Sequence, residues 1–268
     1  MELIEKAIFK LLGGDKIEEK LMKCQSYKAG SVPEWKSQLN LNWQSTIKFL
    51  KAVDVFDSPR IRQVIHNIVI NNKALFNRNK LFITAFGKQG KSGGHIVYEF
   101  KHSQLASKKQ YIQGWEVAKL PEKSTILFVD DIIGTGTQAV GFILEELNSF
   151  LNPSYDPYLL TICATLEGMD KVESETSFRA ICGIILSEEY QYFSEKNNYF
   201  NDNEKRKLKL LNSLIENEEQ EDYYLGLLIS FYYSPPNNSM PILWKNNYPY
   251  QNTEGEDKKW VALIPRNY

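Results

Sequence analysis

The stretch that decides the fold is Ile126-Leu-Phe-Val-Asp130-Asp131-Ile-Ile-Gly134-Thr-Gly-Thr-Gln138. A continuous apolar run leads into two adjacent carboxylates, and a short polar turn follows. Beyond the turn, apolar residues recur at helical spacing, at Val140, Ile143, Leu144, Leu147 and Leu151. The pattern predicts a buried strand, a polar turn and an amphipathic helix. In open α/β sheets the ligand crevice lies beyond the carboxyl ends of the strands, so we expect a site at Asp130 through Thr137.

Three further apolar runs predict neighbouring strands of the same sheet. They are rich in Ile, Leu and Val, do not alternate with polar residues, and are separated by segments long enough for crossover helices. These features are typical of a parallel sheet covered on both faces. The runs are Leu81–Phe86, Leu159–Ala164 and Ile181–Leu186. With 43% hydrophobic residues among 268, the chain can bury a large α/β core.

Composition divides the chain into three parts. Residues 1–75 are helix-prone, and we expect a helical N-terminal extension there. Residues 76–190 hold the four predicted strands and are expected to form the core. Residues 191–268 are dense in aromatic side chains, and no Gly/Ser-rich linker sets them apart. We therefore expect a C-terminal hood that packs on the same domain.

Charge, apolar runs and cysteine spacing exclude several classes of protein. A formal net charge of -1 gives no global field for nucleic acid or for an anionic membrane. No apolar stretch approaches the ~20 residues of a membrane helix, and the first residues lack the form of a signal peptide. The widely spaced Cys24, Cys163 and Cys182 predict buried thiols, because they lack paired ligand spacing. We expect a cytoplasmic protein with no membrane partner.

The turn Gly134-Thr135-Gly136-Thr137 has the chemistry of a phosphate site. Successive backbone N–H groups at the start of a helix favour an anion, and the two threonine hydroxyls add donors. Directly upstream, Asp130 and Asp131 carry acceptors that can bind vicinal sugar hydroxyls or reach a divalent cation through water. A phosphate cradle beside acceptors for a diol predicts a ribose 5-phosphate.

This stretch resembles the 5-phosphoribosyl-1-pyrophosphate (PRPP) signature of type I phosphoribosyltransferases, in which four apolar residues, two acids and two apolar residues precede a small Gly/Thr loop. The resemblance implies a phosphoribosyltransferase-like core in which Asp130 and Asp131 contact the ribose hydroxyls and residues 134–138, ending at Gln138, wrap the 5-phosphate. It also implies Mg2+ as cofactor, held by the two aspartates through water or the ribose hydroxyls. The acid that many members carry after the two apolar residues is replaced by Gly134, so the signature supports the fold better than it supports purine salvage.

Two late motifs extend the resemblance over most of the chain. Pro236-Asn237-Asn238-Ser-x-Pro-x-x-Trp244 and Trp260-x-x-Leu-Ile-Pro-Arg266, together with Gly-Thr-Gly-x-Gln, are similar to a divergent phosphoribosyltransferase-like family of bacterial conflict and antiphage systems. The resemblance implies a role in antiphage defence with a protein partner. Asn237 and Asn238 have the side chains to read a nucleobase edge, but asparagine beside proline is also ordinary turn chemistry.

A second glycine-rich loop, Gly87-Lys88-Gln-Gly-Lys91-Ser92-Gly-Gly94, follows the first predicted strand. In the phosphoribosyltransferase interpretation, Lys88, Lys91 and Ser92 face the pyrophosphate, and Lys91 neutralises charge on the leaving group. The surroundings are strongly basic, and we take this excess as favouring a polyphosphate ligand. Against the single acid Glu99 stand seven basic residues, namely Arg78, Lys80, Lys88, Lys91, Lys101, Lys108 and Lys109.

Two other functions remain open on the sequence. Residues 85–92 satisfy a relaxed P-loop pattern, which predicts a nucleotide triphosphatase. Against it, Gly93-Gly94 is a poor opening for the long helix that a P-loop needs, and residues 134–137 are left without a role. The second alternative is a catalytically silent sensor or scaffold that binds a phosphorylated ribonucleotide and controls a partner protein. Gly134 favours this alternative, because it supplies no general base.

Overall fold

The computed structural model describes residues 2–39, 41–88, 90–215, 225–251 and 255–266. The chain forms two compact units: unit 1 comprises Met1–Asp57 and Glu188–Tyr268, and unit 2 comprises Ser58–Ser187. The boundaries thus fall after residues 57 and 187, where the sequence predicts them after 75 and 190. Among the described residues, no helix has the length and apolar character needed to cross a membrane.

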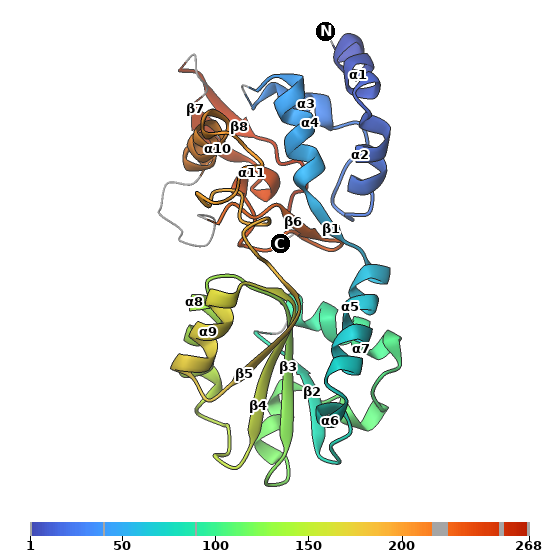
Figure 1. Ribbon diagram of the computed structural model, residues 1–268, viewed down its shortest axis with the longest axis vertical. Helices are drawn as coiled ribbons and strands as arrows, with labels where there is room; N and C mark the ends of the chain where they lie inside the picture. Colours follow the sequence, from blue (N-terminus) through green and yellow to red (C-terminus); the bar gives the residue numbers. More distant parts are fainter. Residues whose placement is uncertain (1, 40, 89, 216–224, 252–254, 267–268) are drawn as a thin grey trace. The chain divides into compact units, whose positions relative to one another are not determined.

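Unit 2 is built on a four-stranded parallel sheet in the order β2-β3-β4-β5 (Figure 1). The strands are β2 (Leu81–Ala85), β3 (Thr125–Ile133), β4 (Asp156–Ala164) and β5 (Arg179–Ile185). All three pairings between neighbours are parallel. The predicted α/β class and parallel sheet are confirmed. β3 and β4 extend beyond the predicted apolar runs, because pairing with each other satisfies their backbone groups at both ends.

Helices cover both faces of this sheet. On one face lie α5 (Ser58–Asn71) and α7 (Ser92–Ser103), and on the other lie α8 (Thr137–Phe142) and α9 (Leu166–Glu175) (Figure 1). A π-helical segment, Ile143–Leu147, continues α8. The short α6 (Lys73–Phe76) leads into β2, and two 3-10 helices, η1 (Lys108–Gln110) and η2 (Gly114–Lys119), lie between α7 and β3.

The helices that follow β2 and β3 lie on opposite faces of the sheet, which makes the end of this strand pair the topological switch point. The chain passes from β2 into α7, bridges back beside β2 at Tyr111 and Ile83, and then enters β3. From β3 it turns instead to α8, on the face where Ile126 and Phe128 are buried. Ligands of open α/β sheets bind at such a point.

Unit 1 joins the N-terminal helices to the C-terminal segment in one core. Its elements are α1 (Glu2–Leu11), α2 (Gly14–Leu21), α3 (Val32–Ser37), α4 (Trp43–Ala52), β1 (Asp54–Phe56), α10 (Asp202–Ile215), β6 (Ile229–Phe231), α11 (Pro241–Trp244), β7 (Tyr248–Gln251) and β8 (Asp257–Trp260). β1 pairs in parallel with β6, and β7 with β8 forms an antiparallel hairpin. The buried indoles of Trp35 and Trp260 donate to the same acceptor, Ile242 O, at 3.2 and 3.1 Å.

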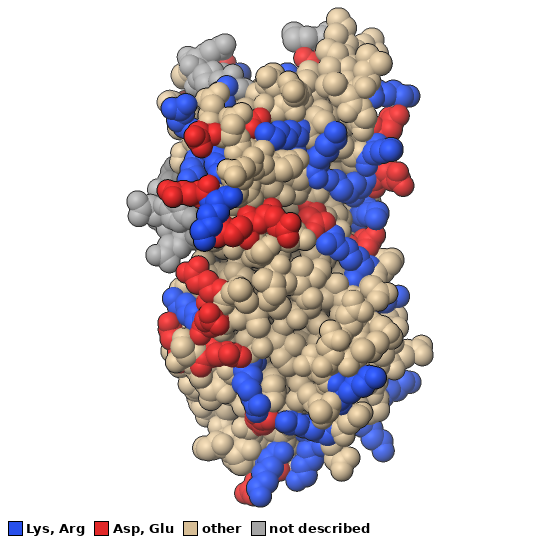
Figure 2. Space-filling model, viewed as in Figure 1, with Lys and Arg blue, Asp and Glu red and all other residues tan. Residues whose placement is uncertain are grey.

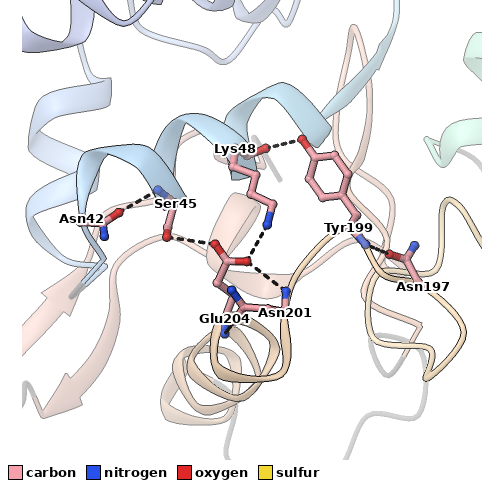
Figure 3. A network of polar contacts seen from close by, with 7 residues as sticks. All are labelled: Asn42, Ser45, Lys48, Asn197, Tyr199, Asn201 and Glu204. Carbon is pink, nitrogen blue, oxygen red and sulfur yellow. Dashed lines mark hydrogen bonds and ion pairs between the residues drawn. The ribbon is translucent and has the colours of Figure 1, made fainter.

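A polar network centred on Glu204 ties α4 to α10 (Figure 3). One carboxylate oxygen accepts from Ser45 Oγ at 3.0 Å, and the other accepts from Lys48 Nζ at 2.6 Å and from the Asn201 backbone N–H at 3.0 Å. Burial opposes ionisation, but these donors outweigh it and lower the pKa of Glu204 below its ordinary value. The stabilisation is therefore present above the ordinary carboxyl pKa and is lost as the pH falls through the lowered one.

Glu204→Gln should lower the free energy of unfolding of unit 1 at pH 7 by about 1–3 kcal/mol, because three donors lose a charged acceptor. The difference from wild type should vanish in acid, where the wild-type carboxylate is protonated. Thermal denaturation between pH 3 and 8 measures both effects, with Glu34→Gln at an exposed carboxylate as the matched control. A pH-independent loss would contradict the electrostatic origin of the effect.

Candidate functional site

Asp130 and Asp131 lie in the part of β3 that extends beyond its pairing with β2. Pairing of β2 with β3 ends at Ala85 and Val129, whereas pairing of β3 with β4 continues to Ile133 and Ala164. The residues from Asp130 onward therefore have β4 on one side and the loop after β2 on the other. The two acids are inside the strand, not just beyond it as the sequence suggests, because β4 continues to pair with them.

A hydrogen bond joins the two candidate loops at Asp130. Ser92 Oγ, at the first residue of α7, donates to Asp130 Oδ1 at 2.6 Å. The same oxygen accepts from the backbone N–H of Asp131 at 3.0 Å. The loop after β2 and the acid pair of β3 are therefore in direct contact, and their common role in one binding site stays a prediction.

Two adjacent carboxylates are held here largely out of water. Asp131 is 6% exposed and Asp130 is half-buried. Burial, and then the charge of Asp131, raise the pKa of Asp130 well above its ordinary value against the opposing hydrogen bonds from Ser92 and the Asp131 N–H. A cation or hydroxyl donors placed against the pair would relieve this cost. The arrangement is suited to binding such groups.

The turn after β3 carries its predicted residues at the start of α8. Gly136 has φ +80°, a left-handed conformation that glycine adopts without cost. Thr137 and Gln138 open the helix and are exposed, and Thr135 Oγ1 lies 3.4 Å from Thr137 Oγ1. The turn therefore leads into the exposed first residues of α8, where a helix start favours an anion.

The turn after β4 supports the turn after β3 from behind. Thr165 Oγ1 donates to Gly134 O at 2.5 Å and accepts from Gly168 N–H at 3.0 Å. A Cβ on Gly168 would lie 2.0 Å from Gly134 O, and one on Gly136 would lie 2.6 Å from Gly168 O. Neither Thr165 nor Gly168 was predicted from the sequence to support the site. A Thr after an apolar strand and three residues before Gly is a helix N-cap pattern that could have identified them.

The loop after β2 leads directly into a helix of 12 residues, Ser92–Ser103. The expectation that Gly93-Gly94 opens a long helix poorly is wrong. Gly93 is required there, because a Cβ would lie 2.5 Å from Phe86 O and 2.7 Å from Val129 O. Close packing of α7 on the strands outweighs the low helix propensity of glycine. The two glycines therefore give no reason to exclude the P-loop alternative.

The two lysines of this loop have different surroundings. Lys91 is exposed at the N-cap position of α7. Lys88 is 69% exposed, and its Nζ lies 3.0 Å from Glu146 Oε1 in the π-helical segment after α8. An exposed ion pair thus links the loop after β2 to the helical segment after α8; such a pair contributes little stability and can exchange for another anion. Contact of either lysine with pyrophosphate stays a prediction.

The predicted basic excess does not gather at one place. Arg78 and Lys80 precede β2, at the amino end of the sheet, whereas Lys88 and Lys91 follow β2 at the carboxyl end. The interpretation of all seven cations as neighbours of the phosphate cradle is wrong, since β2 separates them. Of these four residues, only Lys88 and Lys91 are at the carboxyl end of the sheet, with the acid pair.

Asn237 and Asn238 belong to unit 1, in the loop between β6 and α11. Asn237 Oδ1 accepts from an Arg266 guanidinium N–H, and the Arg266 guanidinium lies 3.8 Å from the centre of the Trp244 ring. These contacts join both late motifs within one unit. Reading of a nucleobase by the two asparagines stays a prediction.

Magnesium fits the donor chemistry at β3. Both acids offer hard oxygen ligands, and Mg2+ typically takes one or two carboxylates together with water and substrate phosphates. Beside them, Thr161 Oγ1 is buried and has no hydrogen-bond partner among the described residues, and Thr161 is paired in register with Asp130. The described part of the chain holds no group of three His, Cys, Asp or Glu residues that could bind a metal. An Mg2+ ion held by the two aspartates would take its other ligands from water and substrate phosphates.

A four-stranded parallel sheet, an acid pair at its switch point and two flanking glycine-rich loops define a phosphoribosyltransferase-like protein. The sequence matches the family described as PRTase-CE over residues 32–266, and the chain belongs to this family. A comparison with curated proteins found no match.

Solved phosphoribosyltransferases resemble part of the chain. The orotate phosphoribosyltransferase of Aeropyrum pernix is 13% identical over 48% of this chain and 73% of its own, with a TM-score of 0.35. The orotate enzyme of Mycobacterium tuberculosis, in complex with inorganic phosphate, is 13% identical over 48% and 71%, with a TM-score of 0.32. The adenine phosphoribosyltransferase of Thermoanaerobacter pseudethanolicus is 16% identical over 48% and 86%, with a TM-score of 0.29.

Gly168→Ala should displace the turn at Gly134, because the added methyl cannot fit against Gly134 O. We expect a loss of about 1–3 kcal/mol in stability, as for other overpacked sites, and weaker binding of inorganic phosphate. Thermal denaturation and calorimetry measure the two effects. Gly141→Ala in α8 is the control, because its Cβ would meet no atom within 4 Å. Unchanged phosphate affinity in Gly168→Ala would contradict the supporting role of the β4–α9 turn.

Proposed function

We propose that this protein binds PRPP with Mg2+ and transfers the phosphoribosyl group to an acceptor, within an antiphage defence system. The observation that carries the proposal is the hydrogen bond from Ser92 to Asp130, which brings a basic glycine-rich loop against an acid pair and a phosphate-type turn. The donor needs the same three parts in one place: cations for pyrophosphate, acceptors for the diol and N–H groups for the 5-phosphate. The defence setting rests on the resemblance of the late motifs.

Each part of the site has a task in this reaction. Asp130 and Asp131 accept hydrogen bonds from the ribose 2- and 3-hydroxyls and so orient C1. The N–H groups and hydroxyls of residues 134–138 hold the 5-phosphate. Lys88, Lys91 and Ser92 contact the pyrophosphate, and Lys88 exchanges Glu146 for the ligand. The ring is then fixed at both ends, which leaves C1 open to attack.

The bond from C1 to the pyrophosphate oxygen breaks as the acceptor atom bonds to C1, and the oxygen keeps the electron pair. Positive charge develops on the ribose ring and negative charge on the leaving group. Lys91 stabilises the leaving pyrophosphate, and the adjacent carboxylates stabilise the ring. Magnesium, when bound, neutralises charge on the pyrophosphate. The acceptor releases its proton to solvent or to its own base, because Gly134 supplies none.

Asp130→Asn combined with Asp131→Asn should weaken PRPP binding by at least about a hundredfold, since two charge-assisted contacts are lost. The variant should stay folded: Asn retains the acceptor for Ser92, and the carboxylate whose pKa burial raises is gone. Its melting temperature at pH 7 should therefore not fall. Titration calorimetry with PRPP and Mg2+ gives the affinity.

The matched control is Asp15→Asn combined with Glu34→Gln, which removes the same charge at exposed positions of unit 1. Unchanged affinity in the Asp130/Asp131 variant, with normal affinity in the control, would refute the proposed donor site. Loss of affinity in both variants would mean that net charge, not the acid pair, controls binding.

Gly134 supports a second candidate, a catalytically silent sensor of a phosphorylated ribonucleotide that controls a partner protein. The Gly134 carbonyl accepts from Thr165, so this residue acts in holding the turn. Incubation with PRPP, Mg2+ and cell extract separates the two candidates, because only the transferase releases pyrophosphate. Phosphate release from ATP that is lost in Lys91→Ala would instead support the P-loop alternative.

A further inference from the structure

Four basic side chains gather at the amino ends of the strands of unit 2. Arg78 and Lys80 precede β2, Lys123 precedes β3, and Arg179 begins β5. Figure 2 shows Lys and Arg side chains over the lower end of unit 2, where these strands begin in Figure 1. At about 3.3 Å per residue, the start of β3 lies about 16 Å from Asp130. This basic cluster is therefore separate from the proposed donor site.

An open depression of about 590 Å³ lies at the cluster. Arg78, Lys80, Lys123 and Asp156 line it, together with asparagine and hydroxyl side chains. Its volume is within the range of small-molecule sites, about 300–1,000 Å³, and is far larger than one simple ion requires. Every residue that lines it has a polar or charged side chain, which suits a polar ligand.

The one acid in the depression is already neutralised. Asp156 Oδ2 accepts from Arg78 at 2.5 Å, and Asp156 Oδ1 accepts from Arg179. Burial opposes ionisation, but the hydrogen bonds from both arginines outweigh it and lower the pKa of Asp156. Arg78 also donates to Thr125 Oγ1 at 2.9 Å, which fixes its guanidinium. Asp156 thus orients both arginines, and the three side chains together carry one net positive charge.

The two lysines, Lys80 and Lys123, add further positive charge to the depression. Lys80 Nζ donates to Glu122 O at 3.0 Å, which holds the ammonium beside the turn before β3. Lys123 occupies that turn with φ +61°, and its backbone N–H donates to Ser154 Oγ at 3.1 Å. Within the described part of the chain, neither ammonium is paired with a carboxylate.

We propose that the depression is a second binding site of unit 2, for a small molecule that carries two or more phosphate groups. The guanidinium fork of Arg78 matches two phosphate oxygens, and the lysine ammonium groups supply point charges on either side. The several cations around one depression favour a ligand with more than one phosphate over a single phosphate ion. The proposal does not depend on PRPP binding at Asp130.

The test uses inorganic pyrophosphate as the probe and the full-length 15N-labelled protein. Backbone amide signals locate the bound ligand: those of Lys80, Lys123 and Ser154 report this site, and those of Ser92 and residues 134–138 report the other. Lys80→Gln combined with Lys123→Gln should weaken pyrophosphate binding at the depression by about tenfold for each lysine. The signals of Ser92 and residues 134–138 should shift with added pyrophosphate as they do in wild type.

Lys16→Gln combined with Lys28→Gln, at exposed positions of unit 1, is the matched control and should bind like wild type. Unaltered Asp130–Gln138 signals in the ligand-free Lys80/Lys123 variant show that it is folded. The proposal would be overturned if pyrophosphate shifted only the signals of Ser92 and residues 134–138. It would also be overturned if the Lys80/Lys123 variant bound pyrophosphate as tightly as wild type does. Citrate binding as tight as that of pyrophosphate would overturn the assignment to phosphate.

Discussion

The placement of a carboxyl group at the buried end of a parallel strand is the constraint on which the site depends. Asp130 and Asp131 together would repel each other there, and burial raises the pKa of Asp130. Ser92 partly offsets this cost by donating to Asp130. Ser92 can reach Asp130 because Gly93 lets α7 pack against Phe86 and Val129. The hydrogen bond from Ser92 and the lack of a Cβ at Gly93 thus bring the loop after β2 against the acid pair of β3.

A glycine also allows close packing on the other side of β3. Gly168 allows the turn after β4 to touch Gly134, and Thr165 joins the two turns by one donated and one accepted hydrogen bond. The phosphate-type turn is therefore shaped by a neighbour that contributes no side chain to a ligand. These contacts hold the turn in one geometry without any ligand, and a preorganised turn would lose less entropy if an anion bound there.

The sequence predicted the sheet, and the turn that follows β3, well where signals are local. Apolar runs identified all four strands, and the acids followed by glycine and threonine identified the turn. It failed where the outcome depends on three-dimensional packing. Gly93 has low helix propensity, yet tertiary contact requires it, and Arg78 and Lys80 are near Lys88 in the chain but at the other end of β2. The fusion of the N-terminal helices with the C-terminal segment was also hidden, because Glu204 meets Ser45 and Lys48 only through the fold.

A crystal structure with PRPP and Mg2+ bound tests the central claim most directly, because it shows which loop holds which part of the ligand. The account predicts the 5-phosphate at the N–H groups of residues 134–138, the ribose hydroxyls at Asp130 and Asp131, and the pyrophosphate at residues 87–92. A ligand held by residues 87–92 alone, with no contact to the acid pair or to the turn after β3, would contradict it.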